Sequence, residues 1–145
     1  FWKRTSHPPS MAIFDAPNRE TCTVRRARTN TPLQALVLMN DVQFFEAARK
    51  FAEKIMHKGG KELNEKLNYA YRTVLGRRPT ETESKSLLNL YNEHLSEFSK
   101  NKETAKEILG SGESIVDESL DQTQLASWTM ITHLILNLSE TVTKG

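Results

Sequence analysis

The sequence predicts a mainly all-α protein, with about five helices around one core and an irregular N-terminal arm. Three observations predict this fold class. Apolar residues recur at three- and four-residue spacing beyond residue 31, helix-capping motifs precede several of these stretches, and residues 1–31 show no helical period. At 145 residues the chain can bury a single core. We therefore expect one helical domain, or the C-terminal part of one.

The composition is typical of a soluble globular protein, with 37% hydrophobic and 26% charged residues. A net charge of +2 argues against a protein that mainly neutralises phosphates. Residues 1–60 hold ten Lys and Arg against five Asp and Glu, whereas residues 61–145 hold ten against thirteen. Either the front half carries a basic binding face, or the two halves neutralise each other where they meet; we favour the second.

Targeting and redox signals are few. No apolar run approaches the ~18 residues of a membrane span, and residues 1–4 are not followed by the apolar core of a signal peptide. There is no initiating Met, so we expect the chain to be cut from something longer. Cys22 is the single cysteine, which excludes an intrachain disulfide.

Residues 1–31 form the predicted arm. Pro8, Pro9 and Pro17 favour extended or turn backbone before them. Long irregular segments are usually functional, disordered or packed against a neighbour. Apolar side chains favour packing, so we expect an ordered arm over the helices; they are Phe1, Trp2, Met11, Ile13 and Phe14.

Three arginines, Arg25, Arg26 and Arg28, lie within four residues of the arm. They cannot all share one direction in an extended chain, so at least one should point inward to a carboxylate or to free carbonyls. One hypothesis is an anion site for phosphate, sulfate, uronate or nucleic acid. The alternative, which we favour, is that they hold the loop together with polar neighbours, namely Asp15, Arg19 and Glu20.

The segment 32–57 should hold the first two helices. Thr31 is a good N-cap, Pro32 fits the first helical position, and Gln34 can complete a capping box. Residues 33–39 are apolar almost all round, which predicts a helix buried on several sides at the centre of the core. The second helix should run from about residue 41 to 57 and end at Lys58-Gly59-Gly60. Its polar residues should face solvent, namely Arg49, Lys50, Glu53 and Lys54.

Residues 61–98 should form a helical hairpin, with helices over about 61–75 and 81–98, joined by a short basic linker and a capping box at Thr80. Residues 99–120 should be the weakest part of the core, with one or two helical turns near 106–109 and then a mobile acidic loop. The closing helix, within 121–140, is nearly as apolar as the first. We expect it to pack centrally beside the first helix, with His133 as a core-edge residue bonded to backbone.

The sequence does not support a catalytic or cofactor site in this chain. The four histidines include no pair at three- or four-residue spacing, so no metal site is predicted. Motifs for haem attachment, phosphate loops and dinucleotide binding are missing from the sequence. Carboxylates are plentiful, but most fall on predicted solvent faces.

The stretch FDAPNRETCTVRRARTNTPLQALVLMNDVQFFEAARKFAEKI resembles the C-terminal domain of planctomycete-type bacterial proteins, the domain of unknown function 1553 family. LNYAYRTVLGRRPTETE and ASWTMITHLILNLSETV resemble later segments of that family, except that Thr141 and Val142 replace an aromatic-leucine step. The resemblance singles out polar positions of the arm as candidates for an anion site or a structural staple, namely Asp15, Arg19, Glu20, Arg25, Arg26, Arg28, Asn30 and Thr31.

The resemblance also implies a context. Such proteins are large exported polypeptides, periplasmic or extracellular, and many carry haem in an upstream cytochrome c domain. This chain would be the C-terminal portion, with no catalytic residue carried over. If the chain continues upstream, the first helix and Phe1-Trp2 should leave an exposed apolar patch.

We therefore interpret the chain as a non-catalytic structural or interaction module at the C-terminus of a larger exported multidomain protein. Its arm would dock upstream domains of the same polypeptide or an anionic partner such as an anionic carbohydrate. The first alternative is one wall of an active site completed by upstream domains, for cytochrome-coupled carbohydrate oxidation; it predicts unpaired arginines in a cleft. The second, nucleic-acid or polyanion binding, predicts a continuous basic stripe, and the acidic second half argues against it.

Overall fold

The structure is a computed structural model that describes residues 13–16, 24 and 31–142. All regular structure among these residues is helical, which confirms the predicted fold class. The elements are α2 (Pro32–Asn40), α3 (Val42–Lys58), α4 (Leu63–Val74), α5 (Glu81–Lys100), α6 (Lys102–Leu109), α7 (Gln122–Leu136) and α8 (Ser139–Val142). None of these helices is both long and apolar enough to cross a bilayer.

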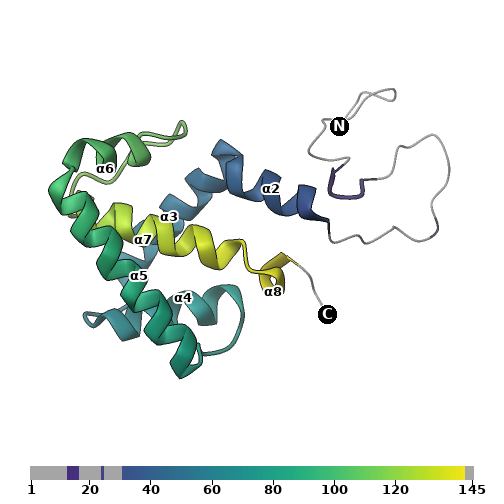
Figure 1. Cartoon of the computed structure of the whole chain (residues 1–145), viewed down its shortest axis with the longest axis horizontal. Helices are drawn as coiled ribbons and strands as arrows, with labels where there is room; N and C mark the ends of the chain where they lie inside the picture. The colour runs from purple at the N-terminus through teal and green to yellow at the C-terminus, as the bar shows by residue number, and fades with distance from the viewer. Residues whose placement is uncertain (1–12, 17–23, 25–30, 143–145) are drawn as a thin grey trace.

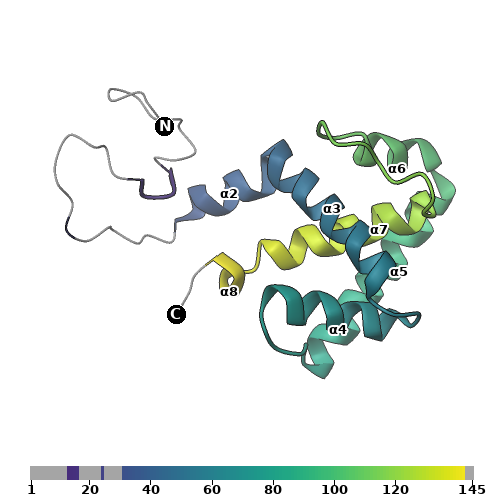
Figure 2. The ribbon, with the colours of Figure 1, turned by 180° about the vertical axis from the view of Figure 1, so that it is seen from behind.

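The helix α7 is the centre of the core. It lies between α3 on one side and α5 and α6 on the other, as the two opposite views show (Figures 1 and 2). Trp128 is buried and its ring lies 5.1 Å from that of Tyr91 on α5. On the opposite side, the Thr132 hydroxyl donates to the Ala48 carbonyl of α3 at 2.9 Å. The predicted central position of the closing helix is confirmed, but its main neighbours are α3 and α5 rather than the first helix.

The helix α2 is the main correction to the sequence prediction. It projects away from the packed helices, toward the right of the view in Figure 1. Only Gln34 and Leu38 are buried, whereas Leu33, Leu36 and Met39 are 52%, 55% and 53% exposed. The prediction of a helix at the centre of the core was wrong. An apolar pattern indicates that a helix packs against other apolar surface, but it does not indicate which segment or partner provides that surface.

The polar face of α3 differs from the prediction as well. Arg49 is completely buried and Glu53 is only 8% exposed, although both were expected to face solvent. The loop between α6 and α7 covers this face, because its backbone amides and carbonyls bond with the α3 side chains. Hydrogen bonds to those loop groups offset the cost of burying charge there.

The segment after α5 is better packed than its sequence indicates. The helix α6 begins at Lys102, and its residues Ala105 and Leu109 are buried in the main core. The expectation that 99–120 would be the weakest part of the core was therefore wrong for α6. The loop that follows it is fixed to α3 by the hydrogen bonds described below.

The local helix signals are confirmed. Thr31 and Thr80 are both N-caps with complete capping boxes. Gly59 follows α3 as its C-cap, and Asp41 caps α3 by accepting from the Gln43 amide at 2.8 Å. These interactions join residues within four positions of one another, so they are readable from the sequence.

Candidate docking surface

The start of α2 holds the short described piece of the arm. The buried side chain of Gln34 donates from Nε2 to the carbonyl of Ile13 at 2.8 Å, while its Oε1 accepts from the Thr31 amide at 3.2 Å. Next to Ile13, the ring of Phe14 lies 6.3 Å from that of Phe44 on α3. For these residues, the arm lies over the helices as predicted.

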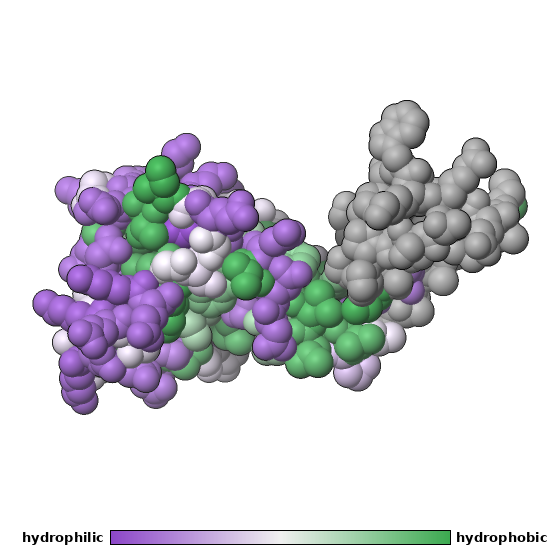
Figure 3. Space-filling model, turned by 90° about the horizontal axis from the view of Figure 1, so that it is seen from above, coloured by the Kyte–Doolittle hydropathy of each residue, from purple (hydrophilic) through white to green (hydrophobic). Residues whose placement is uncertain are grey.

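A group of apolar side chains stays exposed around α2. It includes Leu33, Leu36 and Met39 of α2 together with Val42 and Phe44 at the start of α3. In the space-filling view, hydrophobic residues gather at this end of the bundle (Figure 3). No residue of α2 is ionisable. We call these five residues the α2 surface. Large exposed apolar patches on a protein commonly mark sites of interaction with another protein or a ligand.

An apolar cavity of about 440 Å³ adjoins the α2 surface. Its walls come from the arm and four helices, namely Phe14 of the arm, Leu38 of α2, Phe44 of α3, Leu136 of α7 and Val142 of α8. A cavity with mostly apolar walls, of a volume common for binding pockets, suits an apolar group of a partner. The cavity thus extends the α2 surface inward.

His133 and Asn137 of α7 also line this cavity. Burial lowers the pKa of His133, while a hydrogen-bonding contact with the Leu38 backbone acts in the opposite direction. Burial has the larger effect and therefore favours the neutral imidazole. Among the described residues, His133 Nε2 and Asn137 Oδ1 have no hydrogen-bond partner. His133 lies at the edge of the core as predicted, with its ring 5.1 Å from that of Phe45.

A second cluster fixes the α6–α7 loop to α3. Arg49 Nη2 donates to the carbonyl and the hydroxyl of Ser114 at 2.8 and 2.7 Å. The Glu46 carboxylate accepts from the amides of Glu113 and Ser114 at 3.2 and 2.7 Å. Gly112 adopts φ of +100°, and a Cβ there would lie 2.6 Å from Glu46 Oε2. The cluster provides hydrogen-bond partners for backbone groups of the loop and for the buried guanidinium of Arg49. Its role is therefore structural.

The same loop is held further along α3. Lys50 donates to the carbonyl of Ile115 at 2.6 Å and pairs with Glu53 at 2.8 Å. His57 Nε2 lies 2.8 Å from Asp117 Oδ2. Hydrogen bonds from Ser119, followed by the contact with His57, lower the pKa of Asp117 to about 2. Although Ser119, Asp117 and His57 are all present, serine bonds to the carboxylate rather than to the imidazole, so the arrangement does not activate a nucleophile.

A third cluster joins α8 to the linker between α4 and α5. Arg77 is bidentate to Glu83 at 2.9 and 2.8 Å and to Glu140 at 2.8 and 2.8 Å, and it lies 5.3 Å from the Tyr71 ring centre. Hydrogen bonds from Arg77 lower the pKa of Glu83 to about 2 and raise that of Arg77. The two carboxylates balance the positive charge of Arg77 through charge-assisted hydrogen bonds. The cluster therefore links α8 to the α4–α5 linker and the start of α5.

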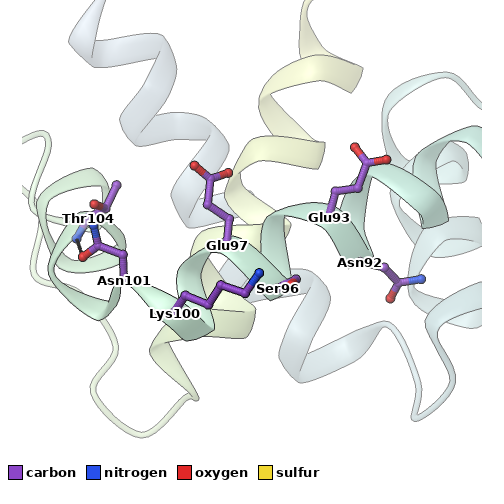
Figure 4. A pocket seen from close by; sticks show the side chains of 7 residues that line it. All are labelled: Asn92, Glu93, Ser96, Glu97, Lys100, Asn101 and Thr104. Carbon is purple, nitrogen blue, oxygen red and sulfur yellow. Dashed lines mark hydrogen bonds between the residues drawn. The ribbon is translucent and has the colours of Figure 1, made fainter.

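A shallow depression along α5 and the start of α6 carries polar side chains, which Figure 4 shows at close range. Glu93 and Glu97 point to one side of the helix, while Asn92 points away from them. The side chains do not converge on a common point, so we assign no site there.

Most of the predicted site residues lie outside the described residues: Arg19, Glu20, Arg25, Arg26, Arg28 and Asn30. Whether they bind an anion or hold the loop stays a prediction. Of the other two, Thr31 serves as the cap of α2, and Asp15 adopts φ of +58°. Such backbone is uncommon for residues other than glycine, although aspartate is enriched there. Among the residues that the structure describes, no cluster of three potential metal ligands occurs.

The sequence prediction missed Arg49 and the cavity. The bonding partner of Arg49 is 65 residues away, and nothing in the local pattern distinguishes it from its solvated neighbour Lys54. The cavity combines residues from the arm to the last helix, so no single segment indicates it. The one available signal was the uncharged, mostly apolar composition of α2.

The fold and this surface define a helical domain with an exposed apolar end. The chain belongs to the PSD1 family, described as protein of unknown function (DUF1553), whose family model matches residues 1–91. The match confirms the resemblance of the arm, α2, α3 and α4. It ends within α5, so the closing segment, which also resembles the family, lies beyond the matched residues. Searches of curated proteins and of solved structures found no match.

Proposed function

We propose that this chain is a non-catalytic interaction module at the C-terminus of a larger exported polypeptide, and that the α2 surface docks an upstream domain of the same polypeptide. The observation that supports the proposal is the exposure of Leu33, Leu36 and Met39, each more than half accessible on a helix without charge. Full burial of a large apolar side chain stabilises by about 1.5–3 kcal/mol, so covering the exposed half of each of these side chains with a permanent neighbour would add about half of that.

The chemistry of the surface selects among partners. An anionic carbohydrate or a nucleic acid needs cations to pair with, and α2 offers no cation. Permanent interfaces are richer in apolar residues than transient ones. A neighbour from the same polypeptide is permanent by covalent connection, so it fits this uncharged surface better than a partner that binds and leaves.

Calorimetry on the separated parts tests the proposal. The polypeptide encoded upstream of the Phe1 codon is produced alone and titrated with this chain. We expect saturable binding with a negative heat-capacity change, because apolar surface is buried. The double variant Leu36→Glu with Met39→Glu should weaken binding by about 100-fold or more, since two charges would be buried without partners. Neither side chain is buried in the isolated chain, so the variant should fold normally.

Ile115→Glu is the matched control. Ile115 is 88% exposed but lies on the α6–α7 loop, outside the α2 surface, so its substitution should leave the affinity unchanged. Equal weakening by both variants would contradict docking through α2. Sedimentation of the chain alone adds a second check: we expect a monomer, and a concentration-dependent dimer lost in the α2 variant would assign the surface to a second copy instead.

The export part of the proposal has its own test. We expect the reading frame upstream of the Phe1 codon to begin with a signal peptide and to encode at least one further domain. A frame without either would contradict the proposed context, independently of the calorimetry.

A further inference from the structure

We infer that the depression between the end of α3 and one face of α4 binds a small multivalent oxyanion, a ligand whose charges are carboxylate, sulfate or phosphate groups. The depression encloses about 690 Å³ and is lined by Lys58, Arg72 and Arg78 together with Asn68, Tyr69 and Thr73. It lies at the opposite end of α3 from α2. The inference goes beyond the docking proposed above and does not depend on it.

The turn after α3 gives the depression its floor. Gly60 adopts φ of +93°, and a Cβ there would overlap the Glu65 carboxylate. A Cβ on Gly59 would lie 2.6 Å from the carbonyl oxygen of Ile55 and 3.0 Å from the Cα of Lys66. Only glycine allows the chain to close so tightly on the start of α4. Because glycine has no side chain, Gly59 and Gly60 leave room above the turn. Lys58 lies beside this turn as the last residue of α3.

One face of α4 supplies the wall. Asn68 and Arg72 are four residues apart, and so are Tyr69 and Thr73, so each pair lies together on the helix surface. The Thr73 hydroxyl donates to the Tyr69 carbonyl at 2.7 Å. Arg78 reaches the depression from the linker that follows α4. Cations from three segments therefore surround one space.

Among the residues that the structure describes, the charges of these three cations are not balanced by partners. No described residue bonds or ion-pairs with the side chain of Lys58, Arg72 or Arg78. Glu65 is the one lining carboxylate, and its Oε2 accepts from the backbone amides of Lys61 and Glu62 at 3.0 and 3.2 Å. That carboxylate is already engaged in capping α4.

Helix dipoles explain part of this arrangement but not all of it. Lys58 is in the last turn of α3 and Arg72 in that of α4, where positive charge is favoured. Arg78 is outside any helix. Its neighbour Arg77 is bound to two carboxylates, Glu83 and Glu140, which leaves Arg78 as the cation directed to the depression.

The residue types select the ligand. Two guanidinium groups can each hold two oxygens of one oxyanion, and an ammonium adds a point charge. Asn68 and Thr73 add polar groups beside them. A ligand with two or more negative charges can engage several of these cations at once, so we expect citrate to bind more tightly than sulfate or phosphate.

Titration of the whole chain by NMR tests the inference. Citrate, sulfate and phosphate are added separately at pH 7, with sodium chloride of equal ionic strength as the reference. We expect saturable shifts at the Gly60 and Thr73 amides and at the Arg72 and Arg78 Nε–H groups. The anion that binds most tightly identifies the preferred oxyanion group. Shifts that sodium chloride reproduces would overturn the inference.

Variants separate a site from general charge. Arg72→Gln with Arg78→Gln should raise the citrate Kd by about tenfold or more, because charge-assisted hydrogen bonds are lost. Lys85→Gln with Lys54→Gln removes the same charge from exposed positions outside the depression and should change the Kd less than about twofold. Equal effects of the two double variants would overturn the inference. So would saturable shifts confined to residues 25–28, which would assign anion binding to the arm instead.

Discussion

The guanidinium of Arg49 and the backbone of Ser114 connect α3 to the loop that precedes α7, with Nη2 2.8 Å from the Ser114 carbonyl oxygen. The side chain of Arg49 is buried, and its Nε and Nη1 atoms have no partner among the described residues. A buried charge held by one of its three nitrogens is costly unless the loop stays in place. The loop and the helix therefore depend on each other.

Replacing Arg49 with alanine should destabilise the fold by about 3 kcal/mol, because it leaves the Ser114 carbonyl unsatisfied and opens a cavity. Denaturant unfolding measures the change. Lys54→Ala, an exposed position on the same helix, should cost less than about 0.5 kcal/mol. If the Arg49 variant loses no more stability than the Lys54 variant, Arg49 does not hold the loop.

Alanine substitutions at two glycines can distinguish the cost of backbone strain from the cost of steric overlap. Gly76 has φ of +71° with open space around it, whereas Gly112 has φ of +100° and faces the Glu46 carboxylate. Gly76→Ala should cost about 1 kcal/mol from conformation alone. Gly112→Ala should cost more, since its methyl group also displaces Glu46 from the loop amides. Thermal unfolding of the two variants gives the comparison, and equal costs would show that Glu46 moves aside freely.

Acid should weaken the tie between α8 and the α4–α5 linker. Arg77, with the Thr80 amide next in effect, lowers the pKa of Glu83 from 4.5 to about 2. A carboxyl whose pKa is lower in the folded state stabilises the fold above its ordinary pKa, and that contribution disappears as the pH falls from about 4.5 to about 2. The group is about one-third exposed, so the effect is modest.

Glu83→Gln should therefore lower stability at pH 7 and flatten its dependence on pH across that acid range. Denaturant unfolding at several pH values from 7 to 2 measures both effects. Glu81→Gln, in the same helical turn, is the control and should leave the shape of the profile unchanged. An unaltered acid limb in the Glu83 variant would exclude this ion pair as its source.

The segment that matches the family should not fold alone. Residues 1–91 lack α7, against which the buried residues Ile55, Leu67 and Tyr71 are packed in the main core. We expect this fragment to show no cooperative thermal transition by circular dichroism, whereas residues 31–145, which lack the arm, should unfold cooperatively. A folded 1–91 fragment would contradict the central role of α7.

The contrast between α2 and its own cap shows what the sequence could predict. Thr31 and Gln34 bond with each other across three residues, so local chemistry fixes where the helix begins. Nothing local fixes its neighbours. The all-round apolar pattern indicated burial, but the structure leaves Leu36 exposed because α3 and α5 already enclose α7.

Arg49 and the oxyanion site show the same limit for functional residues. A charged residue on a helix is assigned to solvent unless its partner is visible, and Ser114 is distant in sequence. Lys58, Arg72 and Arg78 come from three segments whose approach depends on the turn at Gly60. The sequence indicated the ends of these segments but not that they surround one space.

Hydrogen–deuterium exchange tests the docking claim most directly. The exchange of α2 and the start of α3, residues 33–45, is measured in the chain alone and with the upstream polypeptide added. Docking through the α2 surface predicts slower exchange in this segment, while the outer face of α5 is unchanged. Unchanged exchange at residues 33–45, with protection confined to the arginine-rich part of the arm, would contradict the account and place docking there.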